Sequence, residues 1–596
     1  MKKHVTLLIA ALCCFSQIGL SQVNCPEPSA HANINANNIN AKISNGGYLF
    51  RGNDVGNGDN YGAFQVPYAN SESPATIFAA GLWLGGYTGL PNNPILKMSS
   101  VDYGSGSDGY FPGPLTDVGT IGVDTCTNWN KIWTVTKAEI EAHILDIEDN
   151  GVIDNPISSI LGFPCKGNDN FFDVNGFDLP DESTSSQGFA LFVDNVDPSG
   201  LIPNEIGVYE PHLGDFPTPI PAGLNGPVIP SQMSWCVFND LRSTSPGRLE
   251  IQLTTWAVED SNTPVLDNTI FTSYRIINRG QEAIDSFHIG VWVDFDLGCP
   301  TDDFIGSDPC LNTFYTYNQD LVDGGANGDC PAGIPTYGIE PPVQAVTFLG
   351  TKMDHFMAYN NADVNNPPPA TTSPTTPTEY FNYLSGSWKD GTPLTEGGSG
   401  YNPMSSDSAD HAFPGNPNNL TEWSMESTLS SGGDVRAIAS TSQDDLGFPD
   451  LIDMSLSPQE ILETTIAWSF HQGNGYDRLE NVDLMLAEVE QLGDWYEDRL
   501  GYVPRCEEIS SNNNIDFGKN ISLFPNPNNG TFELDFPHGE ISQVQVFDVS
   551  GKLIWEKIED VENSVTIHLQ NIANGIYFLK GKTEEGVFYK KIVVGE

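Results

Sequence analysis

The sequence is short of basic residues. It has 25 Lys and Arg against 78 Asp and Glu among 596 residues, a formal net charge of −53. A surface this acidic repels phosphate backbones, so we expect no nucleic-acid partner, and an anionic membrane face is unfavourable for the same reason. Such a chain attracts metal cations instead.

Long apolar runs and familiar catalytic motifs are also missing. No run reaches the roughly 18–20 residues that a membrane helix requires, and the richest, residues 77–84, contains Gly81. None of the ten histidines lies in an H-E-x-x-H motif, and G-x-S-x-G does not occur. Residues 104–109 fit G-x-G-x-x-G but lack a strand before and a helix after, so we interpret them as a loop. We therefore predict no transmembrane segment and no recognisable catalytic class.

The N-terminus has the pattern of a signal peptide. Two lysines open it, an apolar core follows at residues 5–12, and small residues at 19–21 offer a cleavage point. We predict that residues 1–21 are removed on export. A lipoprotein attached through Cys13 is the alternative, which the bulky Leu12 before it disfavours.

Cysteine is sparse, and no C-x-x-C pair occurs, which disfavours zinc or redox chemistry. Eight of the ten cysteines lie beyond the leader. An even number in an exported chain favours disulfides, so we expect these eight to be largely oxidised. Their connectivity is not fixed by the sequence, but Cys299, Cys310 and Cys330 are close enough to predict one local bridge among them.

Short strand-like runs fill most of the chain between turns rich in its 59 Gly and 42 Pro. Residues 248–258 alternate, with Leu249, Ile251 and Leu253 on one face and polar residues on the other. Comparable runs occupy residues 270–277, 286–295 and 461–470. This pattern predicts a mainly β protein with one or more antiparallel β-sandwich domains and a few helices.

Two segments have helical spacing, residues 137–146 and 477–500. We expect the longer helix to pack on a sheet, and a partner-binding role is the alternative. We assign residues 22–506 to one acidic β-rich exported region. The Pro/Thr-rich loop 362–378 is either a surface excursion or a boundary between two subdomains. The polar residues 507–519 form a linker.

A different pattern begins at residue 520. Its start is Phe524-Pro525-Asn526-Pro527 followed by Gly530. Later come D-V-S-G-K at 548–552, N-G-I-Y-F at 574–578 with Gly575 and Tyr577, and a basic-aliphatic end with Lys590 and Lys591. Seven short strands in about eighty residues predict a small immunoglobulin-like sandwich.

These motifs resemble the type IX secretion system C-terminal sorting domain over residues 520–596. An ordinary terminal sandwich domain is the alternative. The resemblance implies recognition by the type IX translocon, removal of the domain, a secreted or outer-surface location, and attachment to surface lipopolysaccharide. Residues 31–510 resemble large exported proteins that carry the same tag, a group with no established activity that we can transfer.

Acidic residues gather in three places that suit calcium, which prefers oxygen ligands. In the first, Asp294 and Asp296 share a face at the end of a strand, and a Gly- and Pro-containing loop follows. Asp146 opens an EF-hand-like spacing after a helix, although Ile157 stands where the last acid should be. The third segment lies around residues 194–215. Solvated acidic loops are the alternative for all three. The predicted ligands are Asp294, Asp296, Asp302, Asp303 and Asp308; Asp146, Glu148, Asn150 and Asp154; and Asp194, Asp197 and Asp215.

These features predict an exported, cation-stabilised surface protein with a structural or adhesive role. A secreted hydrolase of polysaccharide or protein is the alternative, because paired carboxylates among 78 acids can support glycoside hydrolysis. Four tryptophans are candidates for lining a sugar cleft, although tryptophans are more often core residues. These are Trp83, Trp292, Trp388 and Trp423.

Overall fold

The computed structural model describes residues 24–594 with internal gaps. The gaps are 53–61, 90–91, 105–108, 181–188, 195–207, 224–225, 325–329, 331–332, 361–366, 429, 431, 443–454, 501–502, 507–521, 526–527, 549–552, 558–560, 570–571, 573–574 and 584–585. The predicted signal peptide and the predicted linker 507–519 lie outside the described residues.

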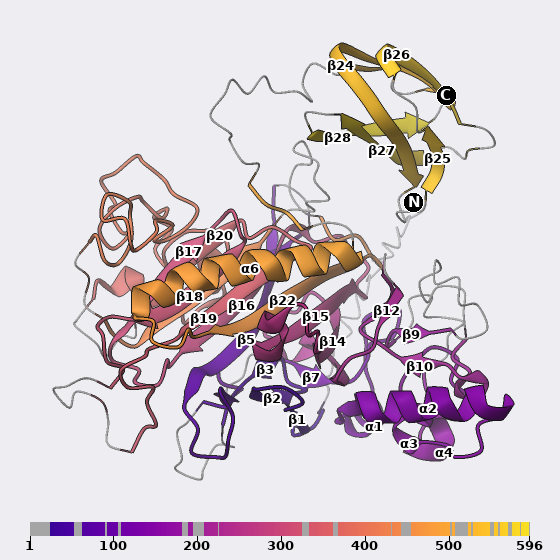
Figure 1. The fold of residues 1–596 in the computed structure, drawn as a ribbon, viewed down its shortest axis with the longest axis horizontal. Helices are drawn as coiled ribbons and strands as arrows, with labels where there is room; N and C mark the ends of the chain where they lie inside the picture. Colours follow the sequence, from indigo (N-terminus) through magenta and orange to yellow (C-terminus); the bar gives the residue numbers. More distant parts are fainter. Residues whose placement is uncertain are drawn as a thin grey trace, which may run out of the picture.

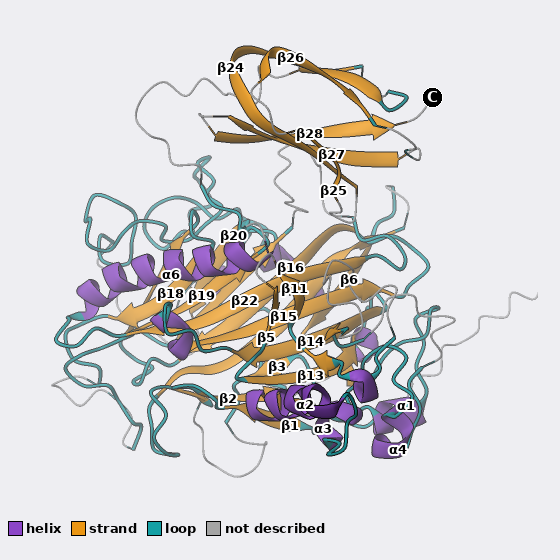
Figure 2. Cartoon of the chain, turned by 45° about the vertical axis from the view of Figure 1, so that its right-hand side comes forward, coloured by secondary structure: helices purple, strands orange, loops and turns teal. Residues whose placement is uncertain are grey.

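Two nine-stranded antiparallel sheets form the body (Figures 1 and 2). Sheet A has the order β1 (His31–Ile34), β2 (Asn40–Ser44), β3 (Tyr48–Leu49), β5 (Ala75–Thr88), β16 (Asp285–Phe295), β21 (Val435–Thr441) and β20 (His355–Asn360), with β4 (Phe64–Gln65) and β6 (Ile95–Ser100) beside this path. Sheet B has the order β17 (Asp303–Asp308), β18 (Thr313–Asn318), β19 (Val343–Leu349), β22 (Ile461–His471), β15 (Thr269–Asn278), β14 (Leu249–Ala257), β13 (Gln232–Asn239) and β7 (Phe111–Pro112), with β8 (Trp133–Thr136) paired to β13.

The main hydrophobic core joins the two sheets. Leu82 and Val291 of sheet A belong to the same buried cluster as Ile251 and Ile466 of sheet B. Aromatic contacts also cross between the sheets, since the Phe314 ring of β18 lies 5.0 Å from the Phe356 ring of β20. Burying apolar area of this kind is worth roughly 25 cal/mol per Å². The body is therefore an antiparallel β-sandwich, as the strand pattern predicts.

Helices cover the outer faces of both sheets. Helix α6 (Arg478–Leu500) contacts β18, β19 and β22 of sheet B and lies across these strands in Figure 1. Helix α5 (Pro377–Leu384) contacts β5, β6, β16 and β21 of sheet A. Val482, Met485 and Val489 of α6 are buried in the main core. The helix expected at 477–500 therefore packs on a sheet.

A second core lies on the other side of β13 and β14, under four short helices. It gathers Trp129, Trp133, Trp235 and Phe171, whose rings contact one another. The helices here are α1 (Val123–Asn128), α2 (Lys137–Asn150), α3 (Ser158–Leu161) and α4 (Phe171–Asn175). Two small two-stranded sheets accompany them, β9 (Phe192–Val193) with β10 (Phe216–Pro217) and β11 (Ile220–Gly223) with β12 (Gly226–Val228). Single 3-10 turns are η1 (Pro211–Leu213), η2 (Asp240–Arg242), η3 (Pro264–Asn268) and η4 (Pro369–Thr371).

Helix α2 is one turn longer than the spacing predicts. Thr136 and Glu139 form a reciprocal capping box at its start. The helix ends at Asn150 because Gly151, with a φ of 82°, takes up the left-handed conformation that closes many helices. Strands β20 and β21, on either side of the Pro/Thr-rich segment 362–378, pair with each other in sheet A.

The C-terminal part forms its own six-stranded sheet. Its strands are β23 (Ser522–Phe524), β24 (Thr531–Asp548), β25 (Leu553–Lys557), β26 (Val561–His568), β27 (Gly575–Thr583) and β28 (Gly586–Val594). The structure describes six strands where the sequence predicts seven, because β24 runs through two of the predicted strands with a register shift between Asp535 and Glu540. Phe532, Leu534, Val546 and Ile592 fill the core of this small sandwich.

Six of the eight mature cysteines form disulfides. The bridge predicted within the local group is Cys299–Cys330. The other two join distant segments, Cys25–Cys126 and Cys310–Cys506. Cys165 and Cys236 are buried free thiols, so the eight cysteines are largely oxidised, as predicted, with two exceptions.

Candidate functional site

Three carboxylates meet at the end of β16. Asp294, Asp296 and Asp434 each place one oxygen so that the three oxygens lie within 4.8 Å of one another. Asp294 stands on β16 directly opposite Arg436 of β21, and Asp296 and Asp434 lie on the residues just beyond and before these strands. The strand pairing therefore brings together acids that are about 140 residues apart.

One guanidinium group holds part of this cluster. Arg436 donates to Asp294 Oδ2 at 3.1 Å and also pairs with Asp434. The Tyr103 hydroxyl donates to the same Asp294 oxygen at 2.7 Å. Asp294 is 2% exposed, and its other oxygen, Oδ1, is buried with no hydrogen-bond partner.

Burial and like charges dominate the electrostatics of the cluster. Burial raises the pKa of Asp294 to about 7, against the lowering effect of Arg436. Burial also raises the pKa of Asp296 well above its usual value, and the neighbouring Asp294 and Asp434 raise it further. Three carboxylates face Arg436, and Arg51 is near enough to lower the pKa of Asp294 and that of Asp296. The carboxylates still outnumber the arginines, so a cation can offset the remaining negative charge.

A second acidic group lies close by, around the start of β17. Asp303 Oδ2 accepts from the Leu297 backbone at 3.1 Å. Asp323 accepts from the backbone N–H groups of Cys299 at 2.9 Å and Tyr337 at 2.5 Å. Burial raises the pKa of Asp302 to about 6 and that of Asp323 to about 7. Four of the five acids predicted for the first calcium site thus lie in two neighbouring clusters.

Asp308, the fifth predicted ligand, lies elsewhere. It ends β17, five residues after Asp303, which along an extended strand is roughly 16 Å. Its Oδ1 accepts from the backbone of Cys310 and Leu311, closing a turn. Part of the segment that the sequence suggests as a Gly- and Pro-containing loop is a strand, because residues 303–308 pair with β18.

The EF-hand-like spacing falls mostly on a helix. Asp146, Glu148 and Asn150 are in α2, where the backbone cannot wrap around an ion as a calcium loop does. Asp146 instead accepts hydrogen bonds from the backbone and side chain of Asn155. Asn150 donates to Asp154. In the third predicted segment, Asp215 accepts from the Glu210 backbone, Asp194 follows β9, and Asp197 lies outside the described residues.

The predicted sorting motif lies on the first turn and last strands of the C-terminal sandwich. Phe524 ends β23 and is 71% exposed, followed by Pro525, while Asn526 and Pro527 lie outside the described residues. Gly530, with a φ of 92°, precedes β24. Gly575 opens β27, where Tyr577 is buried, and Lys590 and Lys591 lie on β28, whose register sets them opposite Leu579 and Phe578.

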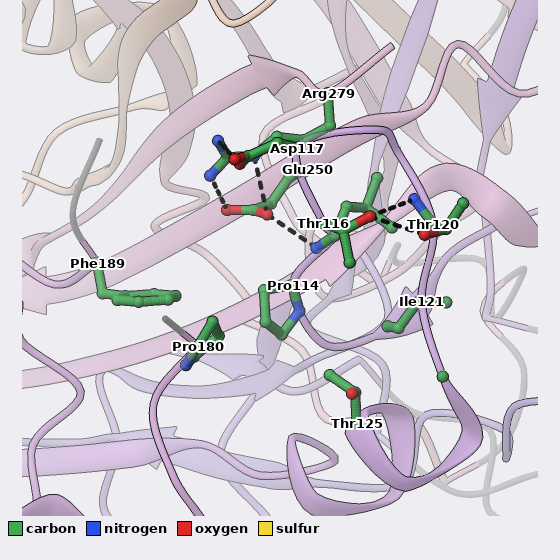
Figure 3. Close-up of a pocket in the computed structure, with 12 residues that line it drawn as sticks. Pro114, Thr116, Asp117, Thr120, Ile121, Thr125, Pro180, Phe189, Glu250 and Arg279 are labelled. Atoms are coloured by element: carbon green, nitrogen blue, oxygen red, sulfur yellow. Dashed lines mark hydrogen bonds and ion pairs between the residues drawn. The ribbon is translucent and has the colours of Figure 1, made fainter. Parts of the chain in front are cut away.

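A small pocket of about 190 Å³ lies beside β14 (Figure 3). Its charged lining residues are Glu250 and Arg279, which face each other, and Asp117, which lies beside Arg279. Glu250 accepts from Arg279 and from the Leu115 backbone. Both carboxylates of the pocket are therefore held near one arginine, and Phe189 and Pro180 form an apolar side wall.

The four tryptophans considered for a sugar cleft are core residues. Trp83 and Trp292 are 0% and 1% exposed and stack on each other. Trp388 and Trp423 are also buried, and each indole N–H donates to a backbone carbonyl, of Gly400 and Gly398.

Several residues at the acidic clusters have no signal in the sequence. Asp434 and Arg436 follow a Gly-rich loop, and only the register of β21 against β16 brings them to Asp294. Asn318 ends β18 and Asp323 follows it, and their spacing matches no metal motif. An acid count in a short window cannot find them, because the partners come from other strands.

The C-terminal sandwich matches a known family. Residues 522–595 match the model of the secretion system C-terminal sorting domain. The protein therefore carries a type IX sorting domain, and it is secreted or placed at the outer cell surface. Among the described residues, no helix is long and apolar enough to cross a membrane.

Comparisons of the whole chain add little. No curated protein matches it. Among solved structures, a polysaccharide lyase has 10% identity and a TM-score of 0.17, with 58% of this chain and 34% of that chain covered. A Faecalibacterium prausnitzii β-glucuronidase has 8% identity and a TM-score of 0.13, covering 51% and 37%. The BSP domain of a biofilm-associated protein has 7% identity and a TM-score of 0.11, covering 61% and 60%.

The chain spans about a third of the lyase and of the glucuronidase. At these scores the likenesses carry no argument about function.

Proposed function

We propose that this exported protein has a non-enzymatic body with a structural or adhesive role, stabilised by bound calcium. The observation that carries the proposal is the cluster of Asp294, Asp296 and Asp434. Its oxygens come from residues on both sides of the β16–β21 pair, so an ion bound there would hold the ends of the two strands together.

The spacing of the cluster suits one calcium ion. Calcium takes six to eight oxygen ligands at 2.3–2.6 Å, so two ligands of one ion lie at most about 5 Å apart. Two carboxylates about 4 Å apart repel each other by about 4 kcal/mol at an effective dielectric of 20. Arg436 and Arg51 offset part of the negative charge of the three carboxylates, and a bound cation would offset the remainder.

The pocket and the aromatic residues support a non-enzymatic body. Glycoside hydrolysis needs one carboxylic acid and one carboxylate facing the substrate. In the described pocket, Glu250 is fully buried against Arg279, which also lies 3.8 Å from Asp117. The tryptophans that would line a sugar cleft are in the core.

Calcium removal tests the proposal. The melting temperature of the mature protein should fall in excess chelator, return with calcium, and recover poorly with magnesium, which demands tighter octahedral geometry. Asp296→Asn should weaken the calcium response, whereas Asp407→Asn, an exposed acid on a loop, should leave it unchanged. An unchanged melting curve in chelator, with no calcium in elemental analysis, would refute calcium stabilisation.

A hydrolase remains the alternative, and it has its own experiment. The purified protein is incubated with a panel of glycans and peptides, and products are followed by mass spectrometry. We expect no cleavage above a heat-treated control. Turnover that scales with protein concentration would overturn the non-enzymatic assignment.

The fate of the tag is a further part of the proposal. We expect the sorting domain to be removed and the body to be attached to surface lipopolysaccharide, as the resemblance to type IX cargo implies. Mass spectrometry of the C-terminal peptide of the mature protein is the check. A free carboxyl terminus on all of the surface protein would contradict the attachment.

A further inference from the structure

Asp303 and Asn318 face each other across the β17–β18 pair. They are direct partners in the antiparallel register, so their side chains project from the same face of sheet B. Phe314, which shares that face, contacts Phe356 of sheet A. The pair therefore lies at the margin of the core between the two sheets, where Asp303 and Asn318 are 1% and 0% exposed.

Three oxygen atoms at this place are buried without a hydrogen-bond partner. They are Asp302 Oδ1, Asp303 Oδ1 and Asn318 Oδ1. Each of these side chains uses its other polar atom, with Asp302 accepting from Gly324, Asp303 accepting from Leu297, and Asn318 donating to Asp320. A buried acceptor left without a partner is unfavourable, and more so when it is charged.

The three side chains are close enough to influence one another. The side chain of Asn318 is near enough to Asp302 to hydrogen-bond with it. Burial raises the pKa of Asp302, and this hydrogen bond lowers it. Burial raises the pKa of Asp303 well above its usual value, and the charge of Asp302 raises it further. The three unpartnered oxygens therefore belong to one polar site.

The surrounding loop is shaped to keep these acids together. Gly298 has a φ of 68°, and a Cβ atom there would stand 2.0 Å from Asp323 Oδ2. The glycine allows the chain after β16 to pass close to Asp323, and the Cys299–Cys330 disulfide closes the loop that contains Asp323. Leu297, in the same stretch, donates its backbone N–H to Asp303.

The geometry points to a second calcium site, formed by Asp302, Asp303 and Asn318 and separate from the Asp294 cluster. Two carboxylates and an amide carbonyl are hard oxygen donors of the kind that calcium binds, and water or backbone carbonyls complete its shell. An ion here would connect β17 and β18 of sheet B to the chain that leaves β16 of sheet A. The site stands on its own observations and does not require the first cluster to bind calcium.

A proton is the competing cation. A protonated Asp303 could donate to Asn318 Oδ1 and satisfy both atoms without a metal. This arrangement would make the region independent of calcium. The two cases differ in how the isosteric variant Asp303→Asn behaves, because its amide supplies the same donor permanently.

The test counts calcium bound to the mature protein and two variants. The protein is stripped with chelator, dialysed against calcium and analysed by elemental analysis and native mass spectrometry. Asp303→Asn should lose one bound calcium relative to the unsubstituted protein. Its melting temperature should also fall less in chelator, since the new amide donates to Asn318 Oδ1. Asp308→Asn, at the far end of the same strand, should keep the full count.

The outcomes separate this site from the first. Asp303 also interacts with the charge of Asp296, so the double variant Asp296→Asn/Asp303→Asn is measured as well. Loss of one calcium in Asp303→Asn with full counts in Asp308→Asn and Asp296→Asn, or loss of a further calcium in the double variant, supports the second site. Loss of the same single calcium in both single variants and in the double variant would show one shared ion and overturn the second site. Equal counts and equal calcium affinity in Asp303→Asn and the unsubstituted protein would overturn it. Loss of calcium in Asp296→Asn alone would support the first cluster and reject the second site.

Discussion

Arg279 donates to both oxygens of Glu250 at 3.2 Å, and both side chains are almost completely withdrawn from solvent. The pair lies under the second core, where Gln252 also donates to Glu250. A buried charge of this kind depends on its partners, and Glu250 is the closer carboxylate that offsets the desolvation cost of the arginine, with Asp117 3.8 Å away.

Removal of the carboxylate should therefore be costly. We expect Glu250→Ala to lower the free energy of unfolding by about 3–5 kcal/mol, since it leaves the arginine charge buried. Glu463, which pairs with Arg275 at 2.7 Å but is 63% exposed, provides the matched control. Glu463→Ala should cost less than about 1 kcal/mol. Equal effects in denaturant titrations would show that burial does not govern the strength of these pairs.

Asp102 should make stability depend on pH. Burial raises its pKa to about 6, although Trp83 and Tyr380 donate to its oxygens and Arg436 lowers the value. The native state therefore holds the Asp102 proton more tightly than the unfolded state. The extra stability of the native state from the tightly held proton is complete below about pH 4 and is lost as the pH rises to about 6. The loss amounts to about 3 kcal/mol of unfolding free energy.

Asp102→Asn isolates this effect. Its carbonyl keeps the Trp83 bond, and its amide can donate to the Tyr380 hydroxyl. As the pH rises from 4 to 6, the unsubstituted protein should lose unfolding free energy that the variant keeps. The variant should therefore become steadily more stable relative to the unsubstituted protein over this range. A difference that is constant over this range, or equal to that of exposed Asp407→Asn, would contradict the prediction.

The disulfides should differ in their contributions to stability. Cys310–Cys506 joins residues 196 positions apart and Cys299–Cys330 joins residues 31 apart. Chain entropy gives about 5 kcal/mol for the longer loop and about 4 kcal/mol for the shorter one. We expect the Cys310→Ala/Cys506→Ala variant to melt at a lower temperature than the Cys299→Ala/Cys330→Ala variant, and the reverse order would contradict the entropic argument.

The two free cysteines should not react with thiol reagents in the native protein. Burial raises the pKa of the Cys165 thiol and that of the Cys236 thiol, so little reactive thiolate forms. Thiol titration of the mature protein should find no reactive group under native conditions and two after unfolding without a reductant. Four or more thiols after unfolding would mean that a described disulfide is absent.

Export should depend on the C-terminal sandwich. Residues 522–595 match the sorting domain, and deletion of residues 520–596 should leave the protein in the periplasm. The same residues fused to a periplasmic reporter should carry it to the surface. Normal surface delivery of the truncated chain would contradict the role of the domain, and fractionation with immunodetection provides the measurement.

The sequence by itself determined the local elements and the export route. The alternation at 248–258 and the helical spacing at 477–500 reappear as β14 and α6, because each follows from the periodicity of one short segment. The sorting domain was equally recognisable from the sequence, since its motifs are turns and strand ends that lie within eighty residues. These features need no knowledge of distant partners.

The tertiary structure decided whether the polar faces of the strands are exposed or buried, and which acidic side chains lie together. Alternation on β14 suggests a solvated polar face, yet Glu250 and Gln252 are buried, because the segment with Phe189 and the short helices covers them. Asp308 leaves the predicted site because its loop is a strand. Asp434 and Asn318 enter the clusters through pairing across strands. Contacts between residues far apart in sequence are set by strand order and register, which no local pattern specifies.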